Sequence, residues 1–116
     1  MRHEESQIQR NCVKWFRLVY PKLSRLLFAV PNGGKRGIRE AAIMKAEGVV
    51  AGVADLLLLI PKGNHHALAI EMKTNKGKQN ENQKLWQMDF EKSGGKYVVC
   101  RCFDEFRSAV ETYLEV

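Results

Sequence analysis

Two apolar runs joined by a short turn-forming segment constrain the fold of this chain more than any other feature. The first run, residues 55–60, reads Asp-Leu-Leu-Leu-Leu-Ile, and the second, residues 67–73, reads Ala-Leu-Ala-Ile-Glu-Met-Lys. The segment between them, residues 61–66, contains Pro, Gly and Asn, which is typical of a connection between antiparallel strands. The sequence therefore predicts a β-hairpin, centred near Asn64, whose two strands pair directly.

The predicted hairpin brings three charged residues together at one end. A centre near Asn64 places Asp55 opposite the neighbourhood of Glu71 and Lys73. Glu71 and Lys73 are two residues apart on one strand, so their side chains leave the same face, whereas Met72 points the other way. Because both acidic residues border strongly apolar runs, we expect their carboxylates at the edge of the core.

Two interpretations fit this arrangement of charges. Facing carboxylates repel each other, and loss of hydration raises their pKa further, unless a cation lies between them. Mg²⁺ suits such a pair because it commonly uses one or two carboxylates and completes its coordination with water, a carbonyl and phosphate oxygens. Lys73 could then orient or deprotonate the attacking water, or neutralise charge in the transition state of phosphodiester cleavage. A surface ion cluster of Asp55, Glu71 and Lys73 is the alternative.

Helical and strand-like patterns alternate along the rest of the chain. Apolar spacing, turn residues and capping signals predict helices over residues 4–19, 38–47 and 83–92, strands over 26–30 and 96–101, and a last helix capped by Asp104. With the hairpin, these elements give the order αβαββαβα. The sequence therefore predicts an α/β fold with a mixed β-sheet, a central hairpin and flanking helices.

Composition narrows the class of protein. The 116 residues fit a single domain, 1–116, and 45% hydrophobic content excludes a disordered basic tail. The formal charge of +6 suggests a polyanionic partner such as nucleic acid or a membrane surface. No apolar run is long enough for a membrane helix, and the first residues lack the apolar stretch of a signal peptide, so we expect a cytoplasmic location.

Cysteine usage argues against two kinds of stabilising site. Cys12, Cys100 and Cys102 are odd in number, have no CxxC spacing and have no histidine nearby. Neither a disulfide framework nor a zinc site is favoured, and we expect buried thiols. The adjacent His65 and His66 fall in the predicted hairpin turn and are interpreted as surface residues.

Five motifs, in order, resemble the VRR-NUC domain, a virus-type replication-repair nuclease domain of the PD-(D/E)xK superfamily. They are Glu5 with Ile8 and Gln9, Pro31 with Asn32, the stretch 48–59, the stretch 70–73, and the stretch 83–86. The resemblance spans about residues 5–101 and implies a restriction-endonuclease-like core with Mg²⁺-dependent deoxyribonuclease activity, in which Mn²⁺ can substitute. Ala54 departs from the proline of the superfamily name, but that proline would shape a turn rather than perform chemistry.

The resemblance also implies roles for individual residues. It implies that Asp55, Glu71 and the Met72 backbone carbonyl are metal ligands and that Lys73 is the catalytic lysine. The first-helix glutamate of the family faces the metal centre directly or through water, and Glu5 matches it. Helical spacing supports this match, because it places Glu5 closer than Glu4 to the apolar stripe of the helix.

A glutamine also belongs to the implied site. The family glutamine at the position of Gln83 lies beside the active site, where it could hold the attacking water or a phosphate oxygen. Spacing places Gln83 on the same helix face as Trp86 and Phe90. Helix capping together with Asn80 is the alternative role.

Substrate and partners follow from the resemblance rather than from single residues. Stand-alone members resemble Holliday-junction resolvases, which implies branched DNA as the substrate, a homodimer and a bacterial or phage-type context. The candidates for phosphate contacts are Lys35, Arg36, Arg39, Lys76 and Lys78. Each of these could equally be a solvated loop residue. A non-catalytic nucleic-acid-binding module with the same fold is the alternative function.

Overall fold

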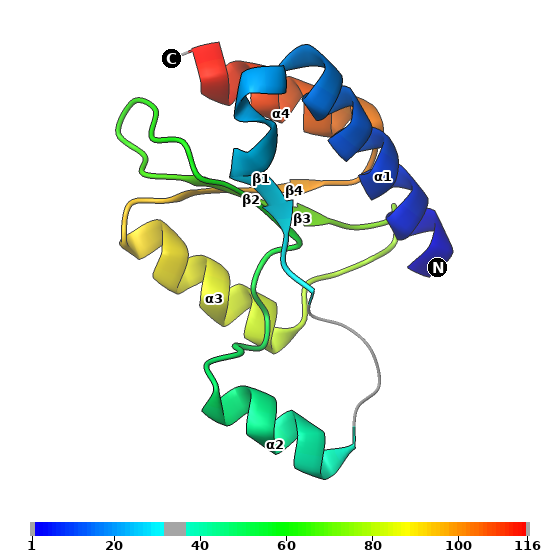
Figure 1. The fold of residues 1–116 in the computed structure, drawn as a ribbon, viewed down its shortest axis with the longest axis vertical. Helices are drawn as coiled ribbons and strands as arrows, with labels where there is room; N and C mark the ends of the chain where they lie inside the picture. The colour runs from blue at the N-terminus through cyan, green and yellow to red at the C-terminus, as the bar shows by residue number, and fades with distance from the viewer. Residues whose placement is uncertain (1, 32–36, 116) are drawn as a thin grey trace.

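A mixed β-sheet forms the centre of the computed structural model, which describes residues 2–31 and 37–115 (Figure 1). Within these residues the sheet has four strands in the order β1-β2-β3-β4. The strands are β1 (Leu27–Ala29), β2 (Leu56–Leu58), β3 (Leu68–Met72) and β4 (Lys96–Cys100). β1 and β2 pair antiparallel, as do β2 and β3, whereas β3 and β4 run parallel. The predicted mixed sheet with a central hairpin is therefore confirmed.

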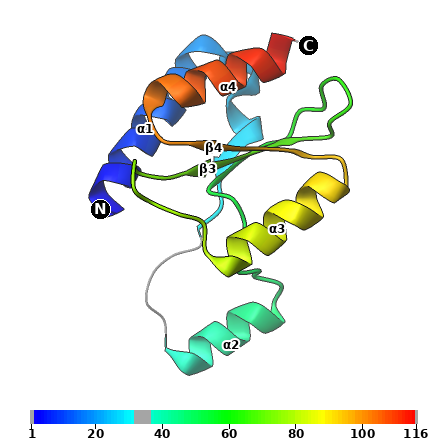
Figure 2. The ribbon, with the colours of Figure 1, turned by 180° about the vertical axis from the view of Figure 1, so that it is seen from behind.

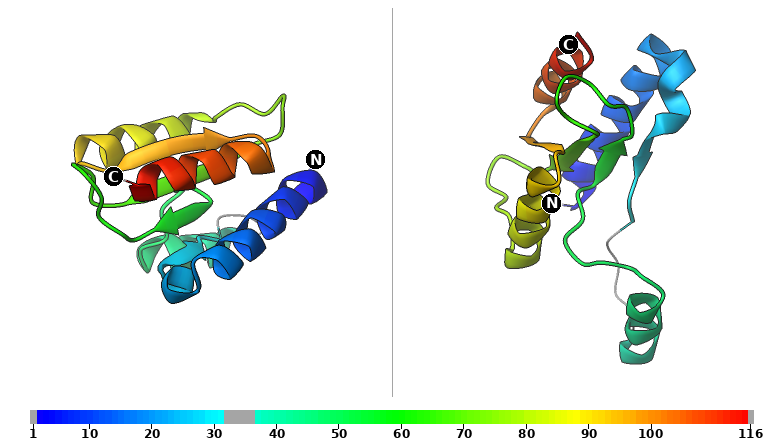
Figure 3. Two further views of the ribbon diagram at one scale, coloured as in Figure 1. Left: turned by 90° about the horizontal axis from the view of Figure 1, so that it is seen from above. Right: turned by 90° about the vertical axis from the view of Figure 1, so that its left-hand side faces the viewer.

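Helices cover both faces of this sheet. They are α1 (Arg2–Val19), the 3₁₀ helix η1 (Pro21–Leu26), α2 (Ile38–Ala46), α3 (Glu81–Lys92) and α4 (Phe103–Glu115). α1 and α4 lie on one face and α3 on the other (Figure 3). The sequence did not predict η1, which follows Pro21 and takes Leu26 from the expected strand. None of the described helices is long and apolar enough to cross a membrane.

Strand alternation sorts the side chains of β3 between two hydrophobic clusters. Leu68, Ile70 and Met72 enter the larger cluster with the apolar faces of α1 and α4, while Ala69 belongs to the smaller cluster under α3. Glu71 has the same parity as Ala69, and the side chain of every residue in β3 is buried. A carboxylate therefore lies inside the molecule on the α3 face.

The hairpin register differs slightly from the prediction. Leu56 pairs with Ile70 and Leu58 with Leu68, so the hairpin is centred on Gly63, one residue before Asn64. At the tip, Lys62 and His65 exchange both backbone hydrogen bonds, so Gly63 and Asn64 together form the turn. Gly63 adopts a left-handed conformation there, with φ of +56°, which glycine does without steric cost. β2 is also shorter than predicted. Asp55 immediately precedes it, level with Glu71.

Three further predictions need correction. α4 begins at Phe103, so Asp104 lies inside its first turn and is not the N-cap. Cys12 and Cys100 are buried, and burial raises the pKa of each thiol to about 12, but Cys102 is exposed. The structure also shows that α2 stands apart from the sheet, beyond α3, with no buried side chain (Figure 2).

Gly52 allows close approach between the segment before β2 and the start of α3. Its φ is +90°, and a Cβ atom here would lie 2.4 Å from the backbone oxygen of Asn82. Gly48 also has a positive φ, of +106°, but a Cβ atom there would meet nothing within 4 Å. Both glycines therefore have a positive φ that other residues rarely adopt, but only at Gly52 would a Cβ atom also clash with neighbouring backbone.

We expect Gly52→Ala to lower the free energy of unfolding by more than ~2 kcal/mol, because it combines a strained φ with a backbone clash. Gly48→Ala, the matched control, should cost about 1 kcal/mol through strain alone. Urea denaturation of both variants measures the difference. Equal losses would show that the approach of Gly52 to Asn82 is unimportant for stability.

Candidate active site

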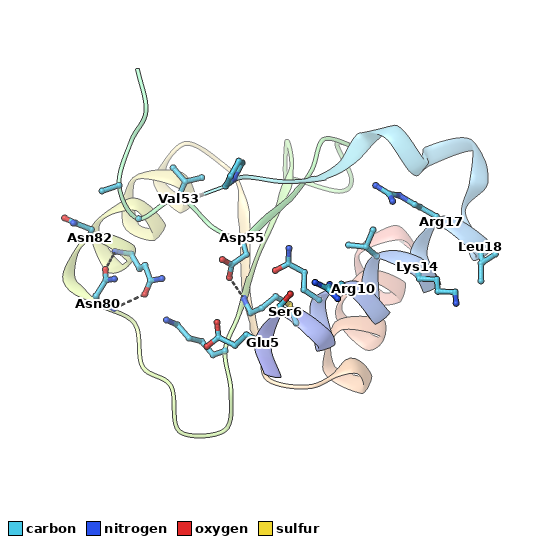
Figure 4. Close-up of a pocket in the computed structure, with 18 residues that line it drawn as sticks. Glu5, Ser6, Arg10, Lys14, Arg17, Leu18, Val53, Asp55, Asn80 and Asn82 are labelled. Carbon is cyan, nitrogen blue, oxygen red and sulfur yellow. Dashed lines mark hydrogen bonds between the residues drawn. The ribbon is translucent and has the colours of Figure 1, made fainter. Parts of the chain in front are cut away.

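A groove of about 1370 Å³ opens at the end of the sheet where β3 finishes (Figure 4). One side of α1, the segment 51–55, the residues that end β3 and the start of α3 line it. The lining includes five of the residues singled out in the sequence: Glu5, Asp55, Met72, Lys73 and Gln83. These four separate parts of the chain thus meet in the groove, and Glu71 itself is not part of its lining.

Asp55 is held at the floor of the groove by the backbone. Its Oδ2 accepts a hydrogen bond of 2.7 Å from the backbone N–H of Met72, and its own carbonyl accepts one of 2.9 Å from Val30. Burial raises the pKa of Asp55, and the charges of Glu71 and Glu5 raise it further, against the lowering by the Met72 N–H and by Lys73. Without a cation, a charged Asp55 is therefore unfavourable in this environment.

Glu71 is the most deeply buried charged group of the site, with 1% of its surface exposed. Its Oε1 accepts hydrogen bonds from the Tyr97 hydroxyl and, at 3.0 Å, from Gln79 Nε2. Its Oε2 is buried without a hydrogen bond among the described residues, and the Lys73 ammonium lies 3.5 Å away. One oxygen is thus fully engaged, while the other has only a loose ion pair.

Tyr97 and Gln79 form a clamp on Glu71 that the sequence did not predict. Tyr97 is buried on β4, and Gln79 Nε2 also reaches Gln87 Oε1 at 2.8 Å and the Tyr97 oxygen at 3.3 Å. Burial raises the pKa of Tyr97 well above its usual range, and the hydrogen bond to Glu71 raises it further. The phenol therefore remains a hydrogen-bond donor to the carboxylate.

The backbone N–H groups of Lys73 and Met72 form hydrogen bonds on opposite sides of the end of β3. The Lys73 N–H donates to the Cys100 carbonyl on the β4 side, whereas the Met72 N–H points the opposite way, to Asp55. In a strand the N–H and C=O of one residue point to the same side, so the Met72 carbonyl also faces the side of Asp55. The Lys73 side chain is 14% exposed and borders the groove.

Glu5, rather than Glu4, faces the groove. Glu5 is half-buried and lines the cavity, while Glu4 is exposed outside it. Glu5 forms no ion pair with any described residue, yet its charge acts on Asp55. Glu5 therefore lies on the side of α1 that helical periodicity indicated, and its role at a metal centre stays a prediction.

Gln83 is engaged in capping α3. Its Oε1 accepts from the Asn80 N–H at 2.8 Å, and Asn80 Oδ1 accepts from the Gln83 N–H at 2.9 Å. This reciprocal arrangement is the capping box that the sequence offered as the alternative role. The amide NH₂ of Gln83 and the second lone pair of its Oε1 are left to serve the groove.

None of the predicted phosphate contacts that fall within the described residues lines the groove. Lys35 and Arg36 are outside the described residues, and Arg39 is exposed on the distant α2. Lys76 and Lys78 are exposed on the loop after β3 and are absent from the groove lining.

Other cations, which the sequence analysis did not single out, do line the groove. They are Arg10, Lys14 and Arg17 of α1. Their i, i+4, i+7 spacing was a usable signal that they share one helix face.

The donor set fits a hard divalent cation with few protein ligands. Among residues 2–31 and 37–115 no three His, Cys, Asp or Glu side chains are close enough to hold a metal ion together. Asp55 and Glu71 provide two carboxylates, and the Met72 carbonyl faces the same side. Two carboxylates with a carbonyl and water form a set that Mg²⁺ accepts, and the unsatisfied Oε2 of Glu71 favours a cation there.

Comparisons with known proteins agree with this geometry. Residues 3–104 match the family model of the VRR-NUC domain. A solved structure described as a VRR_NUC domain protein is similar to this chain, with a TM-score of 0.84 and 28% sequence identity over 96% of this chain and 88% of that chain. No curated protein matches the sequence. The fold is therefore of the nuclease type that the motifs implied.

We expect Tyr97→Phe to lower both stability and metal affinity. Losing a hydrogen bond to a buried carboxylate should cost about 1.5–3 kcal/mol of unfolding free energy, and loss of the clamp should weaken Mn²⁺ binding about tenfold or more. Tyr113→Phe is the matched control, because the Tyr113 hydroxyl donates to the neutral Ile60 carbonyl at 2.6 Å. Thermal denaturation and calorimetric Mn²⁺ titration measure the two effects. Unchanged Mn²⁺ affinity in Tyr97→Phe would contradict the role of the clamp.

Asp55→Asn should stabilise the metal-free protein at neutral pH. Because the pKa of Asp55 is raised on folding, the folded state binds this proton more tightly, so the charged carboxylate opposes folding at high pH. Asn keeps an acceptor for the Met72 N–H without the charge. In EDTA the advantage of the variant should shrink as the pH falls through the folded-state pKa of Asp55. An Asn variant less stable than wild type at neutral pH would contradict this account.

Proposed function

This chain belongs to the VRR-NUC domain family, and we propose that it is a metal-dependent endonuclease that hydrolyses phosphodiester bonds in DNA. The observation that carries the proposal is the buried Oε2 of Glu71, which accepts no hydrogen bond from any described residue. It lies 3.5 Å from the ammonium of Lys73, which lines the groove together with Asp55. Two carboxylates that a cation would stabilise, with the Lys73 ammonium beside them, suit the binding of a metal ion and a phosphate.

Different residues would bind the metal ion, orient the attacking water and hold the Glu71 carboxylate in place. Asp55, Glu71 and the Met72 carbonyl would hold Mg²⁺ or Mn²⁺, with Glu5 acting through water. The bound ion would polarise the phosphate and lower the pKa of a water molecule. Lys73 orients this water or balances negative charge in the transition state, and the clamp holds the Glu71 carboxylate in a single orientation.

Branched DNA is the substrate that we propose, with the protein acting as a homodimer. The motifs that resemble the family support this choice, since its stand-alone members resemble Holliday-junction resolvases. A twofold dimer would present two active sites to the two strands that must be cut in a junction. The proposal for branched DNA is separate from the proposal for cleavage, because no single residue of the groove reads branch geometry.

We expect Glu71→Gln and Lys73→Ala each to lower the cleavage rate at least ~10²-fold while leaving DNA binding largely intact, because each removes a group that acts on the reacting charges. Glu115→Gln and Lys92→Ala, exposed residues outside the groove, are the matched controls and should cut like wild type. Cleavage of junction and linear duplex DNA is followed with Mg²⁺, with Mn²⁺ and with EDTA.

Different outcomes of this experiment favour different functions. DNA binding without cleavage under all conditions, unchanged in Asp55→Ala, would favour the non-catalytic binding module. Cleavage of linear DNA as fast as junction DNA would retain the nuclease and reject the branched substrate. Rates of Glu71→Gln and Lys73→Ala within a few-fold of wild type would remove these residues from the site.

A further inference from the structure

One long side of α1 faces the groove, separate from the side that faces the core. Cys12 and Phe16 are fully buried in the larger cluster, whereas Arg10, Lys14 and Arg17 are exposed and line the groove. The spacing of i, i+4 and i+7 keeps these three cations on one helical face. We call Arg10, Lys14 and Arg17 the α1 basic row.

The row has no counter-charge within the described protein. Neither of the ion pairs formed among described residues includes Arg10, Lys14 or Arg17. Arg17 lies in the last turn of α1, where the helix dipole favours a cation, but Arg10 and Lys14 lie in the middle of the helix. Like charges at i, i+4 destabilise a helix, so an unpaired row is not explained by stability.

The row also extends away from the proposed catalytic residues. Glu5 lies close to Asp55, and the row follows along α1 towards Leu18 at the far end of the groove (Figure 4). Seven residues of α-helix separate Arg10 from Arg17, a rise of about 10 Å. One strand of duplex DNA presents a phosphate about every 3.4 Å along its axis, so the length of the row corresponds to about three steps from one phosphate to the next.

We propose that the α1 basic row binds the phosphate backbone of the DNA strand that leads to the active site, on one side of the cleaved bond. This inference rests on the proposed nuclease function and adds the path of the strand. Continuity of the row with the groove of Asp55 and Lys73 favours a polynucleotide over a separate anionic partner. The strand then runs along α1 towards η1.

A charge-matched pair of variants tests the row. Arg10→Gln/Lys14→Gln/Arg17→Gln removes three positive charges from it, and Lys62→Gln/Lys92→Gln/Lys96→Gln removes three from residues that do not line the groove. Lys62 lies by the hairpin turn, Lys92 ends α3, and Lys96 begins β4, whose far end pairs beside Met72. Binding to junction DNA is measured in EDTA, where no cleavage occurs, over a range of salt concentrations.

The row variant should bind more weakly at low salt, and the slope of log K against log salt should fall in magnitude by about 2 to 3. The control variant should keep the wild-type slope. Circular dichroism and thermal denaturation verify that both variants are folded. Equal slopes in the two variants would overturn the inference.

Neutral linkages locate the path. About three neighbouring phosphates are replaced by uncharged methylphosphonates, and the replaced window is moved along either strand. Binding of the wild-type protein should weaken most at one position of the window. The row variant should be insensitive to replacement at that position and keep its sensitivity at the others. A row variant that retains the whole wild-type pattern would overturn the inference. If the wild-type protein binds DNA through the α1 basic row but does not cut it, the row is supported and the nuclease function is rejected. If the protein cuts DNA but its binding does not depend on the row, the nuclease function is supported and the row is rejected.

Discussion

The burial of the Glu71 carboxylate is the constraint on which the rest of the site depends. A carboxylate that loses its water must be hydrogen-bonded or paired, otherwise its charge destabilises the fold. The chain satisfies one oxygen with Tyr97 from β4 and Gln79 from the loop after β3, and Gln79 is itself held by Gln87 of α3. Three parts of the structure are therefore tied to one side chain. The second oxygen is left for a ligand.

The surrounding fold makes this arrangement tolerable. Clusters of apolar side chains pack on both faces of the sheet and bury β3, the strand that carries Glu71 and ends immediately before Lys73. The loop that follows β3 is also held, because Arg101 Nη1 donates to the carbonyls of Thr74 and Gly77. The contacts that stabilise the fold thus surround the site, and the carboxylates whose charges oppose folding lie at its centre.

Local signals in the sequence were enough to predict the parts of the site that lie on one element or on neighbouring elements. The hairpin follows from two apolar runs and a turn, and it alone brings Asp55 to Glu71. Helical spacing separates Glu5 from Glu4 in the same way. The centre of the strand register was misplaced by one residue because the turn of Gly63 and Asn64 is not centred on the register of the two strands, an offset that local signals do not contain.

Tyr97 and Gln79 depend on long-range pairing, which local signals do not contain. Tyr97 reaches Glu71 only because β4 pairs parallel to β3 in a register that sets Tyr97 beside Ala69. Gln79 reaches it because the loop after β3 folds back. The sequence could not decide between the two roles of Gln83 either. Its position three residues after Asn80 fits the capping of α3, and the same position fits a residue beside the active site.

The hydrogen bond between the Val30 N–H and the Asp55 carbonyl has a consequence for how such chains can diverge. It closes the base of a long excursion in which the chain leaves β1 and returns immediately before β2. With its two ends fastened to each other, the part of the excursion before residues 51–53, which line the groove, can change in length or be exchanged for another segment without displacing Asp55. The acidic centre can thus be inherited unchanged while the protruding part is remodelled for new targets.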